Sequence, residues 1–158
     1  MSEQIKDRNV AVISNEEEVM YTCFYLGDTL CGLDIGLVQE IYDDLNITFV
    51  PLAPEYILGV MNLRGEIITV IDQRCKIGLG NSTMDNSSRI LIVRLNNDFI
   101  GLLVDRIADV VTTTTNKVVK PPSNVKGLQG AYFKGVIHTE SNELLALLDL
   151  DTLLSEER

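Results

Sequence analysis

The sequence predicts a mainly β fold in which two small closed barrels pack together, with a few short helices between strands. Three observations lead to this prediction. The chain has 158 residues and is 46% hydrophobic, which suits one domain or two small subdomains. Short strand-like segments are separated by turn signals, whereas helical periodicity is rare. Two pairs of segments also repeat in the same order, and closed barrels would remove the sheet edges that so many short strands expose.

The repeat has two offsets. Leu26–Ile41 and Leu95–Val110 share a leucine, an apolar pair and Gly-Leu, and they end on matching aliphatic and acidic residues at an offset of 69. Glu66–Asp72 (EIITVID) matches Glu143–Asp149 (ELLALLD) at an offset of 77. The aspartates that end these two strands are expected to cap turns or helices. Two matched pairs in one order predict a tandem duplication of one structural unit.

The repeat and the composition suggest domain boundaries. Residues 1–17 carry little hydrophobic periodicity and are expected to be frayed, whereas residues 18–154 form a single domain. Its approximate halves are 18–77 and 89–154, which can exchange strands. The polar Gly/Ser/Asn stretch between them, at 78–88, is expected to be a connector.

A hairpin and a helix are expected first along the chain. Tyr21–Leu26 and Thr29–Leu33 flank a Gly-Asp turn and read as paired strands. Asp34 can then cap a helix at Ile35–Leu45, in which aliphatic residues form one stripe. On that stripe, Ile41 is expected to fill the core.

A second hairpin follows a turn at Pro54–Leu58. Its strands are Gly59–Leu63 and Glu66–Ile71, and Gly65 between them is free to adopt positive φ. The second half repeats this plan, with an irregular surface stretch at 116–130 and a final helix at 152–157. The strands expected there are Ile90–Leu95, Phe99–Val104, Val110–Thr115, Ala131–His138 and Glu143–Leu148.

Charge and hydropathy limit the classes of partner. A formal net charge of −10 argues against nucleic acid, since phosphate binding needs a basic surface. It also disfavours adsorption to anionic membranes. The N-terminus lacks the pattern of a secretory signal, and no apolar run reaches the roughly 18–20 residues of a membrane helix. We therefore expect a cytoplasmic protein without direct membrane insertion.

Residues for catalysis or metal binding are sparse. His138 is the sole histidine and sits where a hairpin turns, and no Cys/His spacing matches a zinc site. Cys23, Cys31 and Cys75 are expected to be small hydrophobic residues, although a Cys23–Cys31 disulfide across the hairpin is conceivable. The sequence therefore predicts no enzyme, no catalytic residues, no metal and no cofactor. An enzyme that uses Cys31 or Cys75 with His138 is a remote alternative.

A family resemblance rests on residues 59–74, GVMNLRGEIITVIDQR. Together with CGLDIGLVQEI upstream and IGLLVDRIADVV downstream, this segment resembles CheW-type chemotaxis coupling proteins, over about Glu18 to Leu154. A related regulatory domain ends the chemotaxis histidine kinase CheA. The resemblance implies a CheW-like domain of two SH3-like, five-stranded β-barrel subdomains. It implies a non-catalytic adaptor that joins the cytoplasmic tips of chemoreceptors to the CheA regulatory domain.

The resemblance also implies where partners bind. Receptor helices would lie in an apolar groove between subdomains, the kinase domain would dock on a subdomain end, and further copies could join in rings at receptor arrays inside the membrane. Matching positions assign receptor contact to Val38, Glu40 and Val110. They assign kinase coupling to Gly59, Val60 and the turn Asn62-Leu63-Arg64-Gly65.

Some features depart from this pattern or leave alternatives. Thr112–Thr115 and Pro121-Pro122 match no family motif. A paralogue that couples a receptor to a kinase in pilus motility or another chemosensory pathway is one alternative. A soluble receptor that binds a small ligand in the groove is another.

Arg64 stands at the crease of an otherwise apolar hairpin, and Glu40 is the acidic residue on an apolar stripe. We expect the two to form a partly buried, bidentate ion pair that fixes the hairpin against the preceding helix. Breaking a buried pair costs about 3–5 kcal/mol, and lysine would replace such an arginine poorly.

Overall fold

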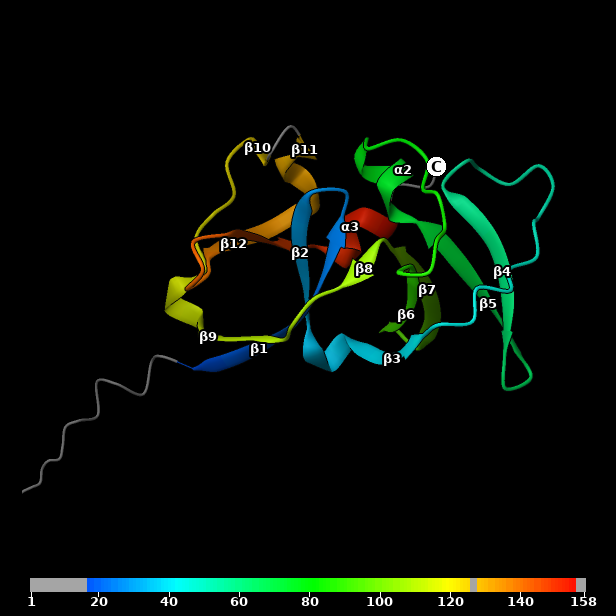
Figure 1. The fold of residues 1–158 in the computed structure, drawn as a ribbon, viewed down its shortest axis with the longest axis horizontal. Coiled ribbons are helices and arrows are strands. Elements are labelled where there is room, and N and C mark those ends of the chain that lie inside the picture. Colours follow the sequence, from blue (N-terminus) through cyan, green and yellow to red (C-terminus); the bar gives the residue numbers. More distant parts are fainter. Residues whose placement is uncertain (1–16, 126–127, 156–158) are drawn as a thin grey trace, which may run out of the picture.

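The computed structural model describes residues 17–125 and 128–155, and these form two curved β-sheets that lie side by side (Figure 1). The mainly β fold class is confirmed. The first barrel has the strand order β3-β6-β7-β5-β4, and the second has the order β12-β13-β2-β1-β8, with β9 also paired to β1. The first barrel consists of β3 (Val38–Tyr42), β4 (Ile57–Leu63), β5 (Glu66–Asp72), β6 (Arg89–Leu95) and β7 (Asp98–Val104).

The second barrel has six strands rather than the five expected, because the counterpart of β3 is split into β8 and β9. Its strands are β1 (Glu18–Leu26), β2 (Thr29–Asp34), β8 (Arg106–Ile107), β9 (Val111–Thr114), β12 (Phe133–His138) and β13 (Leu144–Leu148). A small separate pair is formed by β10 (Asn124–Val125) and β11 (Leu128–Gln129). The helices are η2 (Ile35–Leu37), α2 (Gln73–Ile77), η3 (Thr115–Lys117), η4 (Gly130–Tyr132) and α3 (Leu150–Leu154).

Strand pairing repeats with the two offsets seen in the sequence, as a duplication requires. In the first barrel β5 pairs with β7 in parallel, with Val70 opposite Gly101. In the second, β13 pairs with β2 in parallel, with Leu147 opposite Gly32. Position 147 follows 70 by 77 residues, and 101 follows 32 by 69. The two barrels are therefore built on the same plan.

The two halves of the chain exchange strands. The hairpin β1–β2 belongs to the first half but pairs in the second barrel, and β6–β7 belongs to the second half but pairs in the first. As a result, neither 18–77 nor 89–154 forms a barrel by itself.

The helix expected at Ile35–Leu45 is wrong. Asp34 does act as a cap, since its carboxylate accepts the Gly36 N–H at 2.9 Å, but the helix is the single turn η2. The chain then becomes β3, which pairs with β6. Alternation along this strand turns Ile41 outward, 47% exposed, so the expectation that it fills the core is also wrong.

Both aspartates at the ends of matched strands cap helices, as predicted. Asp72 accepts the Cys75 N–H and begins α2, a helix that was not expected. Asp149 accepts the Thr152 N–H and begins α3 two residues before the expected start, with Asp151 in the first turn. The predicted hairpins are all present with slightly different ends.

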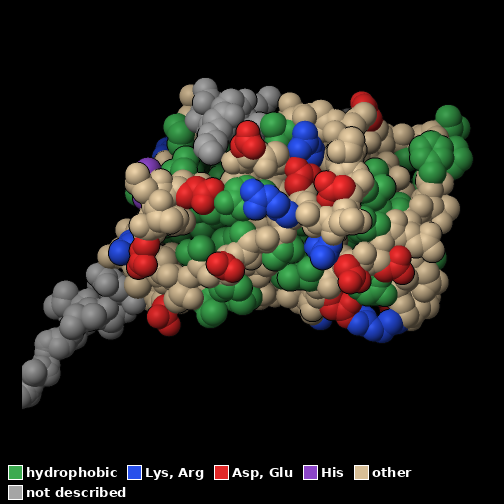
Figure 2. Space-filling view, in the orientation of Figure 1, with side chains coloured by type: hydrophobic (Ala, Val, Ile, Leu, Met, Phe, Trp, Pro, Cys, Tyr) green, Lys and Arg blue, Asp and Glu red, His purple; other side chains and the backbone are tan. Residues whose placement is uncertain are grey.

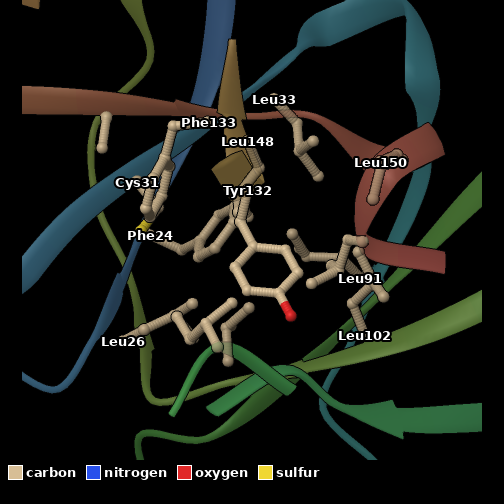
Figure 3. Packing of buried hydrophobic residues seen from close by; sticks show 14 of the residues in the cluster. Phe24, Leu26, Cys31, Leu33, Leu91, Leu102, Tyr132, Phe133, Leu148 and Leu150 are labelled. Atoms are coloured by element: carbon tan, nitrogen blue, oxygen red, sulfur yellow. The ribbon is translucent and has the colours of Figure 1, made fainter. Parts of the chain in front are cut away.

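Buried side chains form three clusters. One lies inside each barrel, and the third, which we call the shared core, lies between the barrels and draws on both sheets (Figure 3). The two barrels therefore pack directly on each other through this core. The shared core includes Phe24, Leu26, Cys31, Leu33, Leu91, Leu102, Tyr132, Phe133, Leu148 and Leu150.

Cys23 and Cys31 are both buried, and neither is part of a disulfide. They point to opposite faces of their sheet, since Cys23 lies in the core of the second barrel and Cys31 in the shared core. A disulfide between them is therefore excluded, and the interpretation as buried hydrophobic residues holds. No helix in the described part of the chain is long and apolar enough to cross a membrane.

Candidate functional site

The β4–β5 turn presents the residues of the Asn-Leu-Arg-Gly segment in different directions. Arg64 and Gly65 both have positive φ, 51° and 88°, as in the type I′ turns that suit tight hairpins. The Asn62 side-chain carbonyl accepts the Gly65 N–H at 2.9 Å and holds the turn. Leu63 points into the barrel, whereas the Arg64 side chain is 69% exposed.

Arg64 and Glu40 are brought together as an ion pair between the guanidinium Nη2 and the carboxylate Oε2. β3 and β4 stand at opposite ends of the strand order, so the pair links the two ends of the first sheet and helps to close the barrel. The expected burial is wrong for the arginine, because the turn projects it into solvent, while the Glu40 side chain is 28% exposed. An exposed pair of this kind contributes about 0–1 kcal/mol, well below the 3–5 kcal/mol expected from burial.

Replacing Arg64 by alanine is accordingly expected to lower the free energy of unfolding by about 1 kcal/mol or less. Arg64→Lys should be close to neutral, because an exposed rim pair does not depend on a planar fork. Urea unfolding at low and high salt would measure both effects, and salt should shrink the difference from the parent protein. A loss of 3 kcal/mol for Arg64→Ala would contradict this account.

Gly59 and Val60 form a second closure of the first barrel. The segment between β3 and β4 crosses β4, where Thr48 and Val60 exchange two backbone hydrogen bonds of 2.7 and 2.9 Å. Gly59 is buried at this crossing, and a Cβ added there would collide with the Thr48 carbonyl oxygen. The glycine therefore permits a close approach of two backbones.

The positions assigned to receptor contact fall on both barrels. Val38 is the first residue of β3; it is partly buried and packs against the shared core. Its counterpart Ile107 on β8 is also partly buried and packs against the same core. Val110 lies just before β9 and is 48% exposed, close to the 47% of its counterpart Ile41. Figure 1 shows β3 and β9 along the lower edge of the molecule, on either side of η2.

We call this surface the β3–β9 face. Figure 2 shows hydrophobic, acidic and basic side chains intermixed along this edge. Two further apolar side chains near it, Met20 and Ile35, are about two-fifths exposed. The face is defined by Val38, Glu40, Ile41, Ile107, Asp109 and Val110.

The assigned residues also line two separate hollows. Glu40, Leu63 and Arg64 line one of about 330 Å³, together with Phe99. Val110 instead lines a hollow of about 540 Å³ between β9 and the β12–β13 turn. The structure therefore joins Glu40 to the turn that the resemblance assigns to kinase coupling, but places Val110 on the other barrel.

Comparison with known proteins agrees with this architecture. The CheW-like domain family matches residues 20–158. The chain belongs to this family. A chemotaxis protein CheW from Treponema pallidum (strain Nichols) is 31% identical over 154 residues, which cover 95% of this chain and 90% of that protein. Protein FrzA from Myxococcus xanthus is 24% identical over 153 residues, which cover 96% and 94%.

A solved structure confirms the fold expected of a CheW-like domain. The crystal structure of scaffolding protein TtCheW from Thermoanaerobacter tengcongensis matches with a TM-score of 0.79 and 34% identity. The match covers 87% of this chain and 88% of that one. The twin-barrel expectation and the family resemblance are both borne out.

Sequence reasoning missed a junction between the barrels of this CheW-like domain. The Arg74 guanidinium contacts the Asp105 carboxylate at 2.7 Å, and the same carboxylate accepts the Gly27 N–H at 2.6 Å. Arg74 also donates to the Leu79 carbonyl at 3.3 Å. The contacts tie α2 of the first barrel to the β1–β2 turn of the second. Because these residues lie far apart in the chain, no local signal could have predicted the contact.

The thiols of this CheW-like domain are poor candidates for nucleophiles. Burial, with a smaller contribution from the Asp109 carboxylate, raises the pKa of Cys23 to about 11. Burial also raises the pKa of Cys75. A reactive cysteine needs a lowered pKa, and the hollow lined by His138 contains no cysteine. Among the residues that the structure describes, no three His, Cys, Asp or Glu side chains are grouped to hold a metal ion.

The raised pKa of Cys23 predicts a loss of stability in alkali. The thiol ionises near its ordinary 9.0 in the unfolded chain but near 11 in the folded one, so its contribution is complete below pH 9 and is lost as pH rises through 11. The free energy of unfolding should fall by about 1.4 kcal/mol per pH unit in that window. Urea unfolding of the parent and of Cys23→Ala from pH 8 to 11 would test this, since the alanine variant should show a shallower slope. Equal slopes would refute the assignment to Cys23.

Proposed function

We propose that this CheW-like domain is a non-catalytic adaptor that joins the cytoplasmic tip of a chemoreceptor to the regulatory domain of a chemotaxis histidine kinase, CheA. The observation that carries the proposal is a full-length match to proteins named for chemotaxis and scaffolding, on a chain whose two barrels present aliphatic side chains at equivalent positions. Half-exposed aliphatic residues such as Ile41 and Val110 suit an amphipathic helix. The protein would act in the cytoplasm, at receptor arrays.

The assigned residues divide between two roles. The receptor tip would contact Glu40 and Val110, and Val38, which is half-buried, would support the surface from below. Gly59, Val60 and the turn Asn62–Gly65 would preserve the end of the first barrel on which the kinase domain docks. Each interface would be small, below about 1,200 Å², with strength arising from many copies in one array, including further copies of this chain in rings.

A second candidate is a coupling protein for a different receptor and kinase pair. The similarity to FrzA, a relative that is not named as a chemotaxis protein, is the observation in favour of this second candidate. Both candidates require binding to a receptor tip and a kinase regulatory domain. They differ in which receptor and kinase bind most tightly, which a panel of purified pairs would decide.

Co-capture tests the proposal. The purified chain is immobilised, and a receptor tip fragment and a CheA regulatory domain are offered separately and together. Both are expected to bind at once. Val110→Asp should abolish capture of the receptor fragment and keep the kinase domain, whereas Met84→Asp, at a 47% exposed apolar residue in the connector, should change neither. Capture of neither partner by the folded protein would overturn the proposal.

A further inference from the structure

Glu40 and Asp109 occupy equivalent places in the two barrels. Each follows a strand residue packed on the shared core and precedes a half-exposed aliphatic residue. The strand pairing around them agrees, because in each barrel five residues on this side lie opposite four on the neighbouring strand. The matched pairs are Val38↔Val93 with Ile107↔Phe24, and Tyr42↔Ile90 with Val111↔Tyr21.

The two carboxylates differ in how they are neutralised. Arg64 on the β4–β5 turn pairs with Glu40. The equivalent β12–β13 turn reads Thr-Glu-Ser-Asn at 139–142 and carries no basic residue. Asp109 is exposed and forms no ion pair with another residue that the structure describes.

The surroundings of Asp109 favour a cation. Asp109 precedes Val110, which lines a hollow together with Glu18 and Glu140. Among the described residues, Lys117 is the one lysine or arginine of that hollow, and His138 also lines it. The whole chain carries a net charge of −10. A basic side chain brought by a partner would therefore meet complementary charge here.

The β3–β9 face thus presents two equivalent pairs, each made of a carboxylate followed by an aliphatic residue. They are Glu40 with Ile41 and Asp109 with Val110, and the aliphatic residues are 47% and 48% exposed. The apolar contacts offered by the two barrels are nearly equal, whereas the charges are not.

We propose that the receptor segment docked on this face carries a lysine or arginine that pairs with Asp109, in the place that Arg64 takes at Glu40. The apolar side chains of the segment contact Ile41 and Val110. This inference rests on the proposed function and specifies the chemistry of its receptor partner. The inference also fixes the direction in which the receptor segment binds. A segment bound the other way round would place its basic residue next to Arg64, and the like charges would repel each other.

Equilibrium binding of the full chain to a purified receptor tip fragment tests the inference. Asp109→Asn is expected to weaken binding about two- to fivefold at low salt, and less at high salt, as for an exposed ion pair. Asp109→Lys should weaken it about tenfold or more, because it places like charges together. Asp98→Asn, at an exposed carboxylate on the β6–β7 turn, is the matched control and should bind as the parent does.

Two further variants test the apolar contacts of the proposed interface. Ile41→Ala and Val110→Ala should weaken binding by similar factors, and all variants should keep the parent's thermal midpoint within about 2 °C because the changed side chains are exposed. Binding of Ile41→Ala equal to that of the parent would overturn the equivalence.

A charge exchange completes the experiment. Changing the lysine or arginine of the receptor fragment to aspartate should restore binding to Asp109→Lys. If the parent binds the fragment and Asp109→Lys binds equally well, the inference fails while the proposed function stands. If the folded parent does not bind at all, both fail.

Discussion

Gly59→Ala is expected to lower the free energy of unfolding by about 3 kcal/mol or more. The added Cβ would collide with the Thr48 carbonyl oxygen and lie 2.8 Å from Ile47 Cγ2. Backbone atoms cannot rotate away as the end of a side chain can, so the crossing segment must move. Movement would break the two hydrogen bonds between Thr48 and Val60 and open the first barrel on one side. Urea unfolding and amide hydrogen exchange at Val60 would measure both effects.

Gly65→Ala is the matched control for this change. Gly65 also has positive φ, but a Cβ there would meet nothing within 4 Å. Its cost should be the backbone strain alone, about 1–2 kcal/mol. Gly59→Ala should therefore be the more damaging variant and should lose hydrogen-exchange protection at Val60, whereas Gly65→Ala should keep it. Equal losses in the free energy of unfolding for the two variants would show that the segment at Thr48 can move away from position 59 at little cost.

Phe24→Ala should destabilise the protein by about 3–5 kcal/mol. Phe24 is fully buried in the shared core, and Figure 3 shows it in one cluster with Leu91 and Leu102 of the other sheet. Because both barrels pack on the cavity that the change would leave, they should unfold in one transition, before and after the substitution. Urea unfolding followed by far-ultraviolet circular dichroism and by intrinsic tyrosine fluorescence would report that single transition as coincident curves.

Phe49→Ala makes the same chemical change at a site that is 74% exposed. It should alter the free energy of unfolding by no more than about 0.5 kcal/mol. Two separated transitions for the parent protein, or a loss at Phe24 as small as that at Phe49, would contradict the shared core.

Local chemistry made the hairpins and caps predictable. The asparagine of the β4–β5 turn and the aspartates that cap α2 and α3 each accept a backbone N–H from a residue three positions later. The duplication was also visible, because its offsets survive in strand residues. The offset of 69 also relates Asp109 to Glu40. This relation could have shown from the sequence that the second barrel has no residue equivalent to Arg64.

Tertiary pairing decided the features that sequence reasoning missed. Ile35–Tyr42 has aliphatic residues at helical spacing, but after the single turn η2 its second part, Val38–Tyr42, pairs with β6 about fifty residues away and becomes a strand. Burial of Arg64 was misjudged for a related reason. The hairpin itself is apolar, but the exposure of its tip depends on where the barrel ends, and local sequence does not carry that information.

The exchange of hairpins between the halves affects the order in which the protein can assemble during synthesis. β1 and β2 leave the ribosome first, yet β2 must wait for β13, more than a hundred residues later, to gain its parallel neighbour. All strands of the other barrel emerge in the meantime, from β3 to β7 without interruption. The oldest part of the nascent chain is thus the last to find a complete sheet, and its apolar surface depends until then on whatever shields it in the cell.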